Sequence, residues 1–453
     1  MRRFVEHALR PVDSASLAAF RILFGAVMCF GALRLIASGW LEVMYVEPSW
    51  TFTYPGFGWV RAWPAWGMYL HYAVLAVLAL MIALGLYHRI VTALFTLGFA
   101  YTQLIDVTNY LNHNYLVVLL GVQLACLPAA GIWSLDARRD PSRARTTIPA
   151  WHVWLLRFQI SIVYVFAGLA KLKADWLLHG QPLNLWLTAR VDTPVIGPLF
   201  AEPWVAMVMS WAGFLFDTTI ALWLSIRRTR VVAYGALVVF HATTGYLLNI
   251  GMFPFIMTTS ALILFSPSWP RRLLRRPAPR TSPVVIDAPP FAPPRRIAIY
   301  AIAIHVVLQL ALPLRHVLYP GGVLWNEDGM RFAWHVVVRE KQGSVTFIAR
   351  FATGKRLEVP PTKYVTPRQE REMAGQPDLI LQLARRVAAD LEARGYRDFT
   401  LHAETQVSLN GRAPHPMIDP EVDLRGVTDV GARGWVLPGP EESPPTLSPR
   451  NSQ

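Results

Sequence analysis

Five residues of one apolar segment are spaced so that they share a helical face. Arg157, Ser161, Tyr164, Gly168 and Lys171 follow one another in alternating steps of four and three residues, the steps that bring side chains to one side of a helix. Ionisable groups at membrane depth cost about 2.5 to 3.5 kcal/mol each, so this face should point at protein or at a cavity. The alternative is that Lys171 ends the helix and extends its amine to the membrane surface.

A second polar group interrupts two apolar runs and consists of Asp106, Asn112, His113 and Asn114. Asp and Asn most often cap exposed turns, and that structural explanation applies here too. The topology below places the group on the same side of the membrane as Lys171. Convergence of His113 with Lys171 is therefore a hypothesis.

A third group, His241 with Asn249, Gly251 and Met252, surrounds a turn between two later apolar segments. A lone histidine in a helix is more often a core residue with a hydrogen-bond partner than a catalyst. We keep both interpretations of His241.

Several common chemistries lack their sequence pattern. The twelve histidines show no zinc-ligand spacing, so no metal is expected. There is no glycine-rich phosphate loop and no serine nucleophile with a convergent base. What remains is a lysine and a histidine near the membrane interface, which suits proton abstraction from an apolar, membrane-soluble substrate.

The composition places the chain in a lipid bilayer. Hydrophobic residues make up 53% of the 453 and charged residues only 16%, with a mean hydropathy of +0.33, which is unlike a soluble domain. The net charge of +14 comes mostly from short arginine clusters between apolar runs. That distribution indicates membrane topology and not nucleic-acid binding.

About nine segments approach the 20 or so apolar residues that a spanning helix needs. They cover residues 16–36, 68–87, 90–107, 115–130, 151–172, 204–226, 231–248, 253–265 and 297–314. We therefore expect a polytopic α-helical membrane protein with about nine transmembrane helices and a C-terminal extramembrane α+β domain.

The arginine clusters set the expected orientation. Clusters at residues 2–3, 88–89, 138–145, 227–230 and 271–276 all fall on one side if the N-terminus is cytoplasmic, as the positive-inside rule requires. Tryptophans on the opposite loops suit the membrane interface. The N-terminal run lacks a cleavage site, so the first span is expected to stay in the protein. The expected location is the bacterial inner (plasma) membrane, with the C-terminal domain extracytoplasmic.

The chain divides by composition into five parts. We expect a helical membrane domain over residues 1–267, a Pro/Arg-rich cytoplasmic connector over 268–296, the last span over 297–318, an extracytoplasmic α+β domain over 319–437 and a disordered tail over 438–453. Cys29 and Cys126 fall inside expected spans, so they define neither a disulfide framework nor a metal site.

The C-terminal domain carries both strand and helix patterns. Residues 332–338 and 344–351 are predicted to pair around a turn at Gln342 and Gly343, and residues 399–409 alternate like a further strand. Residues 379–391 have the apolar spacing of a helix.

Segments across the chain resemble the vitamin K-dependent γ-glutamyl carboxylases, in their bacterial form with a membrane domain of the HTTM type. The segments are residues 16–25, 111–116, 159–176, 250–253, 265–273, 407–412 and 418–423. Their combination is far more specific than any one of them.

The resemblance implies a peptidyl-glutamate 4-carboxylase, a carbon-carbon lyase. The lysine of the A-G-x-x-K-L-x-A-D-W stretch, here Lys171, would act as the neutral amine that deprotonates vitamin K hydroquinone. A lysine desolvated in an apolar site suits that role. Oxygen then converts the cofactor into a strong base that removes a γ-proton from a peptidyl Glu, and CO2 adds to the carbanion. O2 and CO2 are co-substrates.

The resemblance also assigns the other site residues. His113 matches a histidine of the carboxylation half-reaction, with Asn112 beside it. Tyr164 and Met252 match positions that would line the cofactor pocket, and we add His241. Arg331 and Trp334 are expected near the acceptor Glu, since an arginine suits a carboxylate. The candidate catalytic residues are therefore Lys171 and His113. The candidate cofactor-binding residues are Asn112, Tyr164, Met252 and His241, and the candidate substrate-binding residues are Arg331 and Trp334.

The chain departs from the family pattern at two places. The family's Lys-Lys pair is Ala170-Lys171 here, and the chain ends soon after residue 423, so docking of a propeptide as in animal members is in doubt. The expected partners are the bilayer and a Glu-containing secreted or periplasmic peptide, with no nucleic acid. Alternatives are a non-catalytic membrane homologue that binds a quinone, a lipid or a partner protein, and a transporter, for which no repeat is visible.

Overall fold

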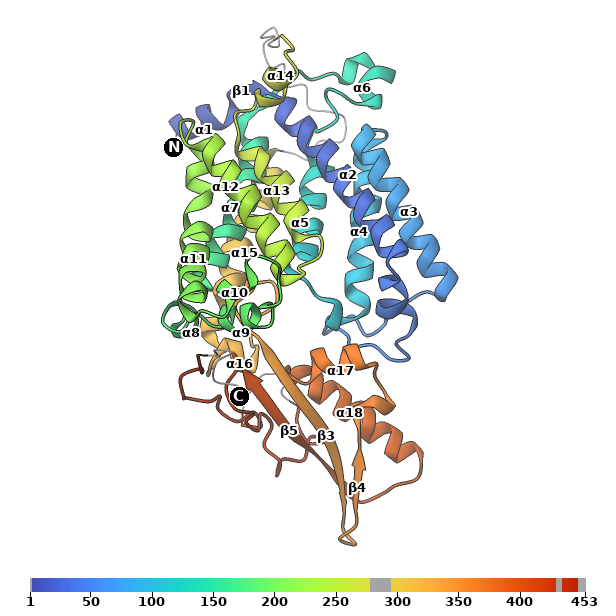
Figure 1. The fold of residues 1–453 in the computed structure, drawn as a ribbon. Coiled ribbons are helices and arrows are strands. Elements are labelled where there is room, and N and C mark those ends of the chain that lie inside the picture. Colours follow the sequence, from blue (N-terminus) through green and yellow to red (C-terminus); the bar gives the residue numbers. More distant parts are fainter. Residues whose placement is uncertain (1, 278–294, 429–433, 447–453) are drawn as a thin grey trace.

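A helical bundle and a smaller α+β domain are stacked end to end (Figure 1). The structure, a computed structural model, describes residues 2–277, 295–428 and 434–446. The N-terminus lies at the end of the bundle opposite to the C-terminal domain, together with α1, α6 and α14. Most of the expected connector and the last residues of the expected tail lie outside the described residues. The two ends of the bundle therefore carry different elements, and the orientation in the membrane stays a prediction.

Helices occupy all nine expected spans. Their bounds are α2 Ala15–Ala37, α3 Ala65–Leu84, α4 His88–Ile105, α5 Asn112–Cys126, α7 Ala150–Leu169, α11 Pro203–Ser225, α12 Arg230–Leu248, α13 Phe253–Ala261 and α15 Arg295–Leu314. Within the described residues, six helices are long and apolar enough to cross a membrane: α2, α3, α7, α11, α12 and Ile297–Leu318. Helix α5 has 15 residues and α13 has nine. The expected count of nine is therefore not confirmed.

Short elements join these helices and line both ends of the bundle. The helices and turns are α1 Arg2–Leu9, η1 Glu42–Val46, η2 Val107–Asn109, α6 Leu135–Arg139, η3 Pro141–Arg143, α8 Ala174–Leu177, α9 Leu183–Thr188, α10 Gly197–Phe200, η4 Leu262–Leu264, α14 Trp269–Leu273 and η5 Arg315–Leu318, and the strands are β1 Pro11–Asp13 and β2 Thr147–Pro149. β1 and β2 pair antiparallel and hold the first residues of α2 and α7 together.

Two glycines allow helix backbones to approach closely. A Cβ atom on Gly25 of α2 would lie 2.5 Å from the amide nitrogen of Ala83 in α3. A Cβ atom on Gly168 of α7 would lie 2.5 Å from Cγ2 and 2.8 Å from the amide nitrogen of Thr218 in α11. Small residues are what membrane helices use for such contacts. The second contact matters for function because it brings the C-terminal half of α7 against the middle of α11.

Hydrogen bonds between amide side chains fasten α15 to the bundle. The Nε2 group of Gln159 on α7 donates to Oε1 of Gln309 on α15 at 3.1 Å, and Gln309 donates to the Tyr115 hydroxyl at 3.0 Å. Gln123 of α5 donates to Gln159 at 3.2 Å and lies 3.0 Å from Nε2 of His305. We call Gln123, Gln159 and Gln309 the glutamine cluster. It positions α15, the helix that leads into the C-terminal domain.

The C-terminal domain is a three-stranded antiparallel sheet covered by helices. Its elements are α16 Val323–Asn326, β3 Lys341–Phe351, β4 Arg356–Val359, η6 Pro361–Lys363, α17 Pro367–Met373, α18 Pro377–Ala393 and β5 Phe399–Leu409. The strand order is β4-β3-β5. Buried residues of α18 at helical spacing, such as Leu383 and Val387, pack in one core with Phe347 and Leu401 of the sheet. The predicted helix at 379–391 and the strand at 399–409 are confirmed.

The strand predicted at residues 332–338 is wrong. Residues 341–343 belong to β3 itself, which pairs with β5 from Lys341 opposite Leu409 to Phe351 opposite Phe399. Residues 332–338 instead form an irregular loop with left-handed backbone at Phe332, Trp334 and Val337 (φ +61°, +57° and +55°). The apolar alternation arose because Phe332 and Trp334 pack against the membrane domain, while Val338 packs in the core of the C-terminal domain.

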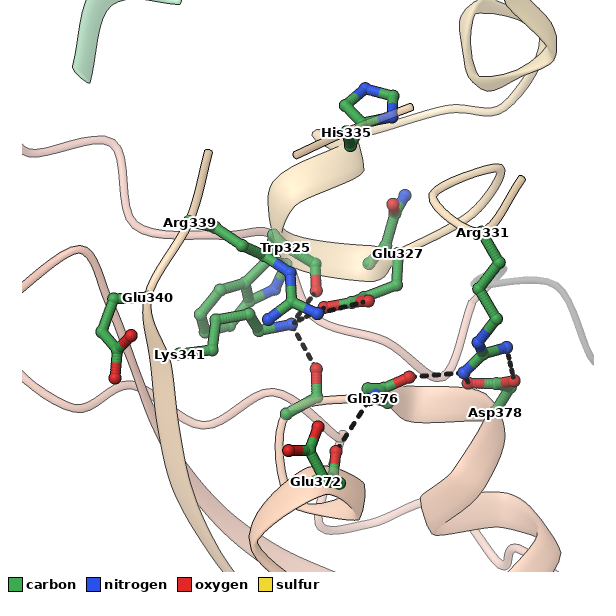
Figure 2. A network of polar contacts seen from close by, with 12 residues as sticks. Trp325, Glu327, Arg331, His335, Arg339, Glu340, Lys341, Glu372, Gln376 and Asp378 are labelled. Atoms are coloured by element: carbon green, nitrogen blue, oxygen red, sulfur yellow. Dashed lines mark hydrogen bonds and ion pairs between the residues drawn. The ribbon is translucent and has the colours of Figure 1, made fainter. Parts of the chain in front are cut away.

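Buried charges at the start of β3 tie the sheet to the preceding turn. Figure 2 shows Lys341 and Arg339 converging on Glu327. The Lys341 ammonium donates to the Trp325 carbonyl at 2.6 Å and to Glu327 at 3.2 Å, and it also reaches the Gly375 carbonyl. Burial lowers the pKa of Lys341 to about 8, although the Glu327 carboxylate opposes the shift. Keeping this lysine charged in the folded protein therefore lowers the free energy of unfolding.

Replacing Lys341 should change how stability depends on pH. Since the folded pKa of about 8 lies below that of the unfolded chain, deprotonation between about pH 8 and 10.5 favours the folded state, by on the order of 3 kcal/mol. Thermal unfolding in detergent should therefore show the wild type gaining on Lys341→Met as the pH rises through this range. The exposed Lys355→Met should follow the wild type, and a constant gap between wild type and Lys341→Met would contradict the assignment.

Candidate functional site

Lys171 lies just past the end of α7 with its amine buried. Only 4% of the residue is exposed. Its Nζ donates to Oδ2 of Asp217 at 2.8 Å, to the Ala167 carbonyl at 3.1 Å and to the Val336 carbonyl at 3.3 Å. It also lies 5.1 Å from the ring centroid of Trp176. The amine therefore faces protein and not lipid, so the alternative in which it extends to the membrane surface does not hold.

Asp217 is the anion that meets this lysine. It lies in the middle of α11 and is 6% exposed. The close contact between Gly168 and Thr218, its neighbour in sequence, sets the spacing of the two helices at this level. A buried carboxylate in a spanning helix requires a partner, and Lys171 supplies it.

Residues 332–338, called the inserted loop, extend from the C-terminal domain into the membrane domain. Trp334 is 1% exposed and belongs to the core of the helical bundle. Its ring stacks on Tyr115 with centroids 5.0 Å apart, and the Phe332 ring lies 5.0 Å from Tyr115 and 5.1 Å from Tyr110. Aromatic packing therefore holds the loop in place.

The inserted loop links the two predicted catalytic segments. The Asn112 side chain donates to the His335 carbonyl at 3.1 Å, and Lys171 donates to the adjacent carbonyl of Val336. Consecutive peptide units thus contact the start of α5 and the end of α7. Asn112 and Lys171 therefore contact neighbouring peptide units of this loop, and the convergence of His113 with Lys171 stays a prediction.

A second polar pair joins α7 to α12. The Tyr164 hydroxyl and Nε2 of His241 are 2.8 Å apart, and both residues are buried. The Phe253 ring lies 5.6 Å from the His241 ring and 6.0 Å from the His113 ring. His241 and His113 therefore both lie against Phe253, and Tyr164 joins this group through His241.

Met252 and Arg331 lie toward the edges of this arrangement. Met252 packs on α2, where a Cβ atom on Gly31 would be 3.4 Å from its Cε. Arg331 donates to Asp378 at 2.7 and 3.3 Å and also reaches Gln376 (Figure 2). The Arg331 guanidinium is thus already paired within the C-terminal domain.

The capped-turn interpretation holds for Asp106, which caps η2, but this residue is buried and not exposed. Asp106 accepts from the amide and hydroxyl of Thr108 at 2.9 and 2.8 Å, and from Gln369 at 2.7 Å. Asn114 donates to Gln103 at 2.8 Å. These side chains shape the turn that leads to His113, and their hydrogen bonds are used within the protein.

Buried nitrogens without a hydrogen-bond partner among the described residues include Trp334 Nε1 and His335 Nδ1 of the inserted loop and His241 Nδ1 of α12. Burial lowers the pKa of His335 to about 3, and the nearby His316 and Lys173 contribute smaller shifts in the same direction. Its imidazole is therefore neutral at physiological pH. Orphaned buried polar groups are uncommon in proteins, so each of these nitrogens is a candidate to bond a water or a ligand.

An ion pair docks the C-terminal domain beside the site. Asp175, four residues after Lys171, accepts two hydrogen bonds of 2.7 Å from Arg412 and one of 2.7 Å from Asn410. Burial alone would raise the pKa of Asp175, but the hydrogen bonds from Arg412 and Asn410 lower it below its ordinary value. A cavity of about 350 Å³ lies alongside, lined in part by Lys173, Asp175, Trp325 and Arg412.

The fold and this site define a class of protein: a polytopic helical membrane protein whose extramembrane domain completes a buried polar site in the bundle. The HTTM domain model matches residues 9–269, and the model of the vitamin K-dependent gamma-carboxylase lumenal domain matches residues 294–442. The chain belongs to the vitamin K-dependent gamma-carboxylase family. No solved structure matches it.

Sequence reasoning missed Asp217, the glutamine cluster and the partner of Asp175. Asp217 was detectable, because it is an ionisable residue inside an otherwise apolar run at 204–226, and such residues are functional by default. The glutamines are neutral and scattered over three helices, so no local pattern reveals them. Asp175 and Arg412 lie in two of the motif segments, but the sequence does not show that they meet.

Breaking the docking pair should loosen the C-terminal domain. Asp175→Asn leaves the buried Arg412 without an anion, and we expect a loss of about 2 to 4 kcal/mol and a lower Tm in detergent. Combining it with Arg412→Met should restore part of that loss, as a double-mutant cycle would measure. Removing the exposed partner of Arg350 in Glu421→Gln is the matched control and should leave the Tm nearly unchanged. Equal shifts from both carboxylate variants would refute the role of Asp175.

Proposed function

We propose that this protein is an integral-membrane carboxylase that uses vitamin K hydroquinone, O2 and CO2 to convert peptidyl Glu to γ-carboxyglutamate. The observation that carries the proposal is the buried amine of Lys171. It bonds the carbonyl of Val336 in the inserted loop, next to the His335 carbonyl that Asn112 bonds. Family membership supplies the reaction class. The burial of the Lys171 amine and its position near Asn112 support its assignment as the base.

The residues present fit a bound hydroquinone. An aromatic diol needs apolar walls and a few hydrogen-bonding groups at fixed places. Phe216, Phe240 and Phe253 surround His241, whose Nδ1 lacks a partner. Tyr164 orients this imidazole through its hydroxyl. Tyr164, His241 and Met252 would therefore hold the cofactor, with Asn112 at the loop.

The protein's own contribution is to bind, orient and remove a proton. When bound, the reduced vitamin K supplies, together with O2, the strength of base needed at the γ-carbon of Glu. Lys171 would take a proton from a hydroxyl placed against it. His113 lies buried next to Phe253, where the aromatic surroundings exclude water. The inserted loop closes the site from the side of the C-terminal domain.

The acceptor peptide would approach from the side of the C-terminal domain. Trp334 lies in the core between that domain and the bundle. Arg331 already binds Asp378, so an incoming carboxylate would share or displace that partner. We propose that this side is extracytoplasmic in a bacterial inner membrane, because the arginine-rich loops gather at the opposite end of the bundle. The acceptor would then be a secreted or periplasmic peptide.

A reconstituted assay tests the function directly. Purified protein in lipid nanodiscs would be given a reduced menaquinone-type cofactor, bicarbonate and a Glu-rich peptide. We expect epoxide by chromatography and a gain of CO2 on Glu by mass spectrometry. Binding of the quinone with neither product would overturn the enzymatic proposal and favour a non-catalytic quinone-binding homologue.

Lys171→Ala should abolish epoxide formation, because no other amine contacts Asp217 in the described part of the chain. A general base contributes on the order of 100-fold or more, so the product should fall to background. Lys173→Ala, two residues along, is the matched control and should retain activity. Epoxide formed by Lys171→Ala without an added amine would contradict the assignment of the base.

His113→Ala should separate the two products. The family resemblance places this histidine in the carboxylation half, so we expect CO2 incorporation to fall by on the order of 100-fold and epoxide to fall much less. Both products would be measured in the same reaction mixture. Asn114→Ala, whose side chain bonds Gln103, controls for disturbance of the turn. Parallel loss of both products would argue against this division of labour.

A further inference from the structure

Asp217 has a role that neither family membership nor the sequence motifs assign. It is a carboxylate in the middle of a spanning helix, where an ionisable group is costly to bury. It forms an ion pair with Lys171, the amine proposed to start the reaction. A purely structural contact between α7 and α11 would be cheaper with apolar residues, because the two backbones already approach through Gly168.

The contacts of Lys171 match the hydrogen-bonding needs of a protonated amine. An ammonium has three N–H donors, and three acceptors surround Nζ: Asp217 Oδ2, the Ala167 carbonyl and the Val336 carbonyl. Only Asp217 is an anion. A protonated lysine is therefore fully satisfied in this arrangement, and such a lysine cannot act as a base.

A neutral amine would have two N–H donors and one lone pair, so one of these three contacts must be given up. The contact with Asp217 is the shortest at 2.8 Å, and the contact with Val336 is the longest at 3.3 Å. The Ala167 carbonyl belongs to α7 itself and is fixed by the helix. The lone pair would thus point toward Val336, on the inserted loop, where a substrate hydroxyl can replace the carbonyl.

We propose that Asp217 is a positioning residue that keeps the Lys171 amine aimed at the inserted loop and stabilises the ammonium once the proton has been taken. The inference rests on the proposed function for the identity of the proton donor. In the step, the O–H bond of the bound hydroquinone breaks and its electron pair stays on oxygen. A new N–H bond forms at Nζ, and the resulting ammonium is neutralised by the carboxylate of Asp217.

Other titratable groups face this pair from the neighbouring elements. Tyr164 lies on the same helix and His241 on α12, and the two share a hydrogen bond. Lys173 and His335 lie beyond the end of α7 and in the inserted loop. No acidic residue other than Asp217 is bonded to Lys171 among the described residues. The charge on Asp217 should therefore dominate the protonation of the lysine.

Lysine NMR tests this electrostatic role without any cofactor. The sequence contains only five lysines, at positions 171, 173, 341, 355 and 363, so side-chain signals from selectively labelled lysine can be resolved and assigned with Lys171→Arg. In Asp217→Asn the titration midpoint of Lys171 should move to lower pH, because the amide keeps the shape but removes the charge. Asp217→Glu should restore it, and the Lys173 signal should not change. An unchanged Lys171 midpoint in Asp217→Asn would overturn the proposal.

Activity gives the second measurement. Asp217→Asn should lower kcat for epoxide formation by about 10- to 100-fold with little change in KM, and the acid limb of its pH profile should move to lower pH. Asp217→Glu should recover part of the rate. Thr219→Ala, on the exposed side of the same helix, is the matched control. Full activity in Asp217→Asn would also overturn the proposal.

The two measurements separate the inference from the proposed function. If the wild type forms no epoxide but the Lys171 midpoint still depends on Asp217, the carboxylase assignment fails and the pairing stands. If the wild type is active and Asp217→Asn changes neither the midpoint nor the rate, the pairing inference alone fails. The opposite assignment, in which Asp217 is the base and Lys171 positions it, is excluded if Lys171→Ala is inactive while Asp217→Asn retains a slow rate.

Discussion

The contact between α7 and α11 at Gly168 is the constraint on which the rest of the site depends. Any side chain at this position would collide with the backbone of Thr218. Because the helices approach so closely, Asp217 reaches Lys171 directly and both groups leave the lipid. The same face of α7 carries Tyr164, which holds His241 of α12. One close helix contact thus organises the polar groups of three helices.

The C-terminal domain completes this arrangement. It contributes the inserted loop, whose carbonyl groups accept from Asn112 and Lys171, and whose Trp334 packs in the core of the bundle. The loop backbone adopts left-handed conformations at three residues with side chains, which persist only where the surroundings enforce them. The stacking on Tyr115 and the docking of Arg412 on Asp175 provide that enforcement.

Periodicity made the membrane helices, α18 and β5 predictable from the sequence, because their burial follows the helix and strand periods. The shared face of Tyr164, Gly168 and Lys171 was predictable for the same reason. The inserted loop was not, since its apolar side chains are buried against distant helices and so imitate a strand. The pairing of Lys171 with Asp217 depends on how two helices are placed in space, and no local pattern in either segment encodes it.

The glutamine cluster has a consequence for how the protein is assembled. Few residues of α15 are buried, so side-chain packing holds this helix weakly, and amide hydrogen bonds to α5 and α7 contribute a large part of its attachment. Those partners are synthesised well before α15. During biogenesis the last helix must find a bundle that is already formed. The C-terminal domain follows that helix in the chain, so the inserted loop can enter the bundle only afterwards. Until then the Lys171 site would lack the loop that covers it.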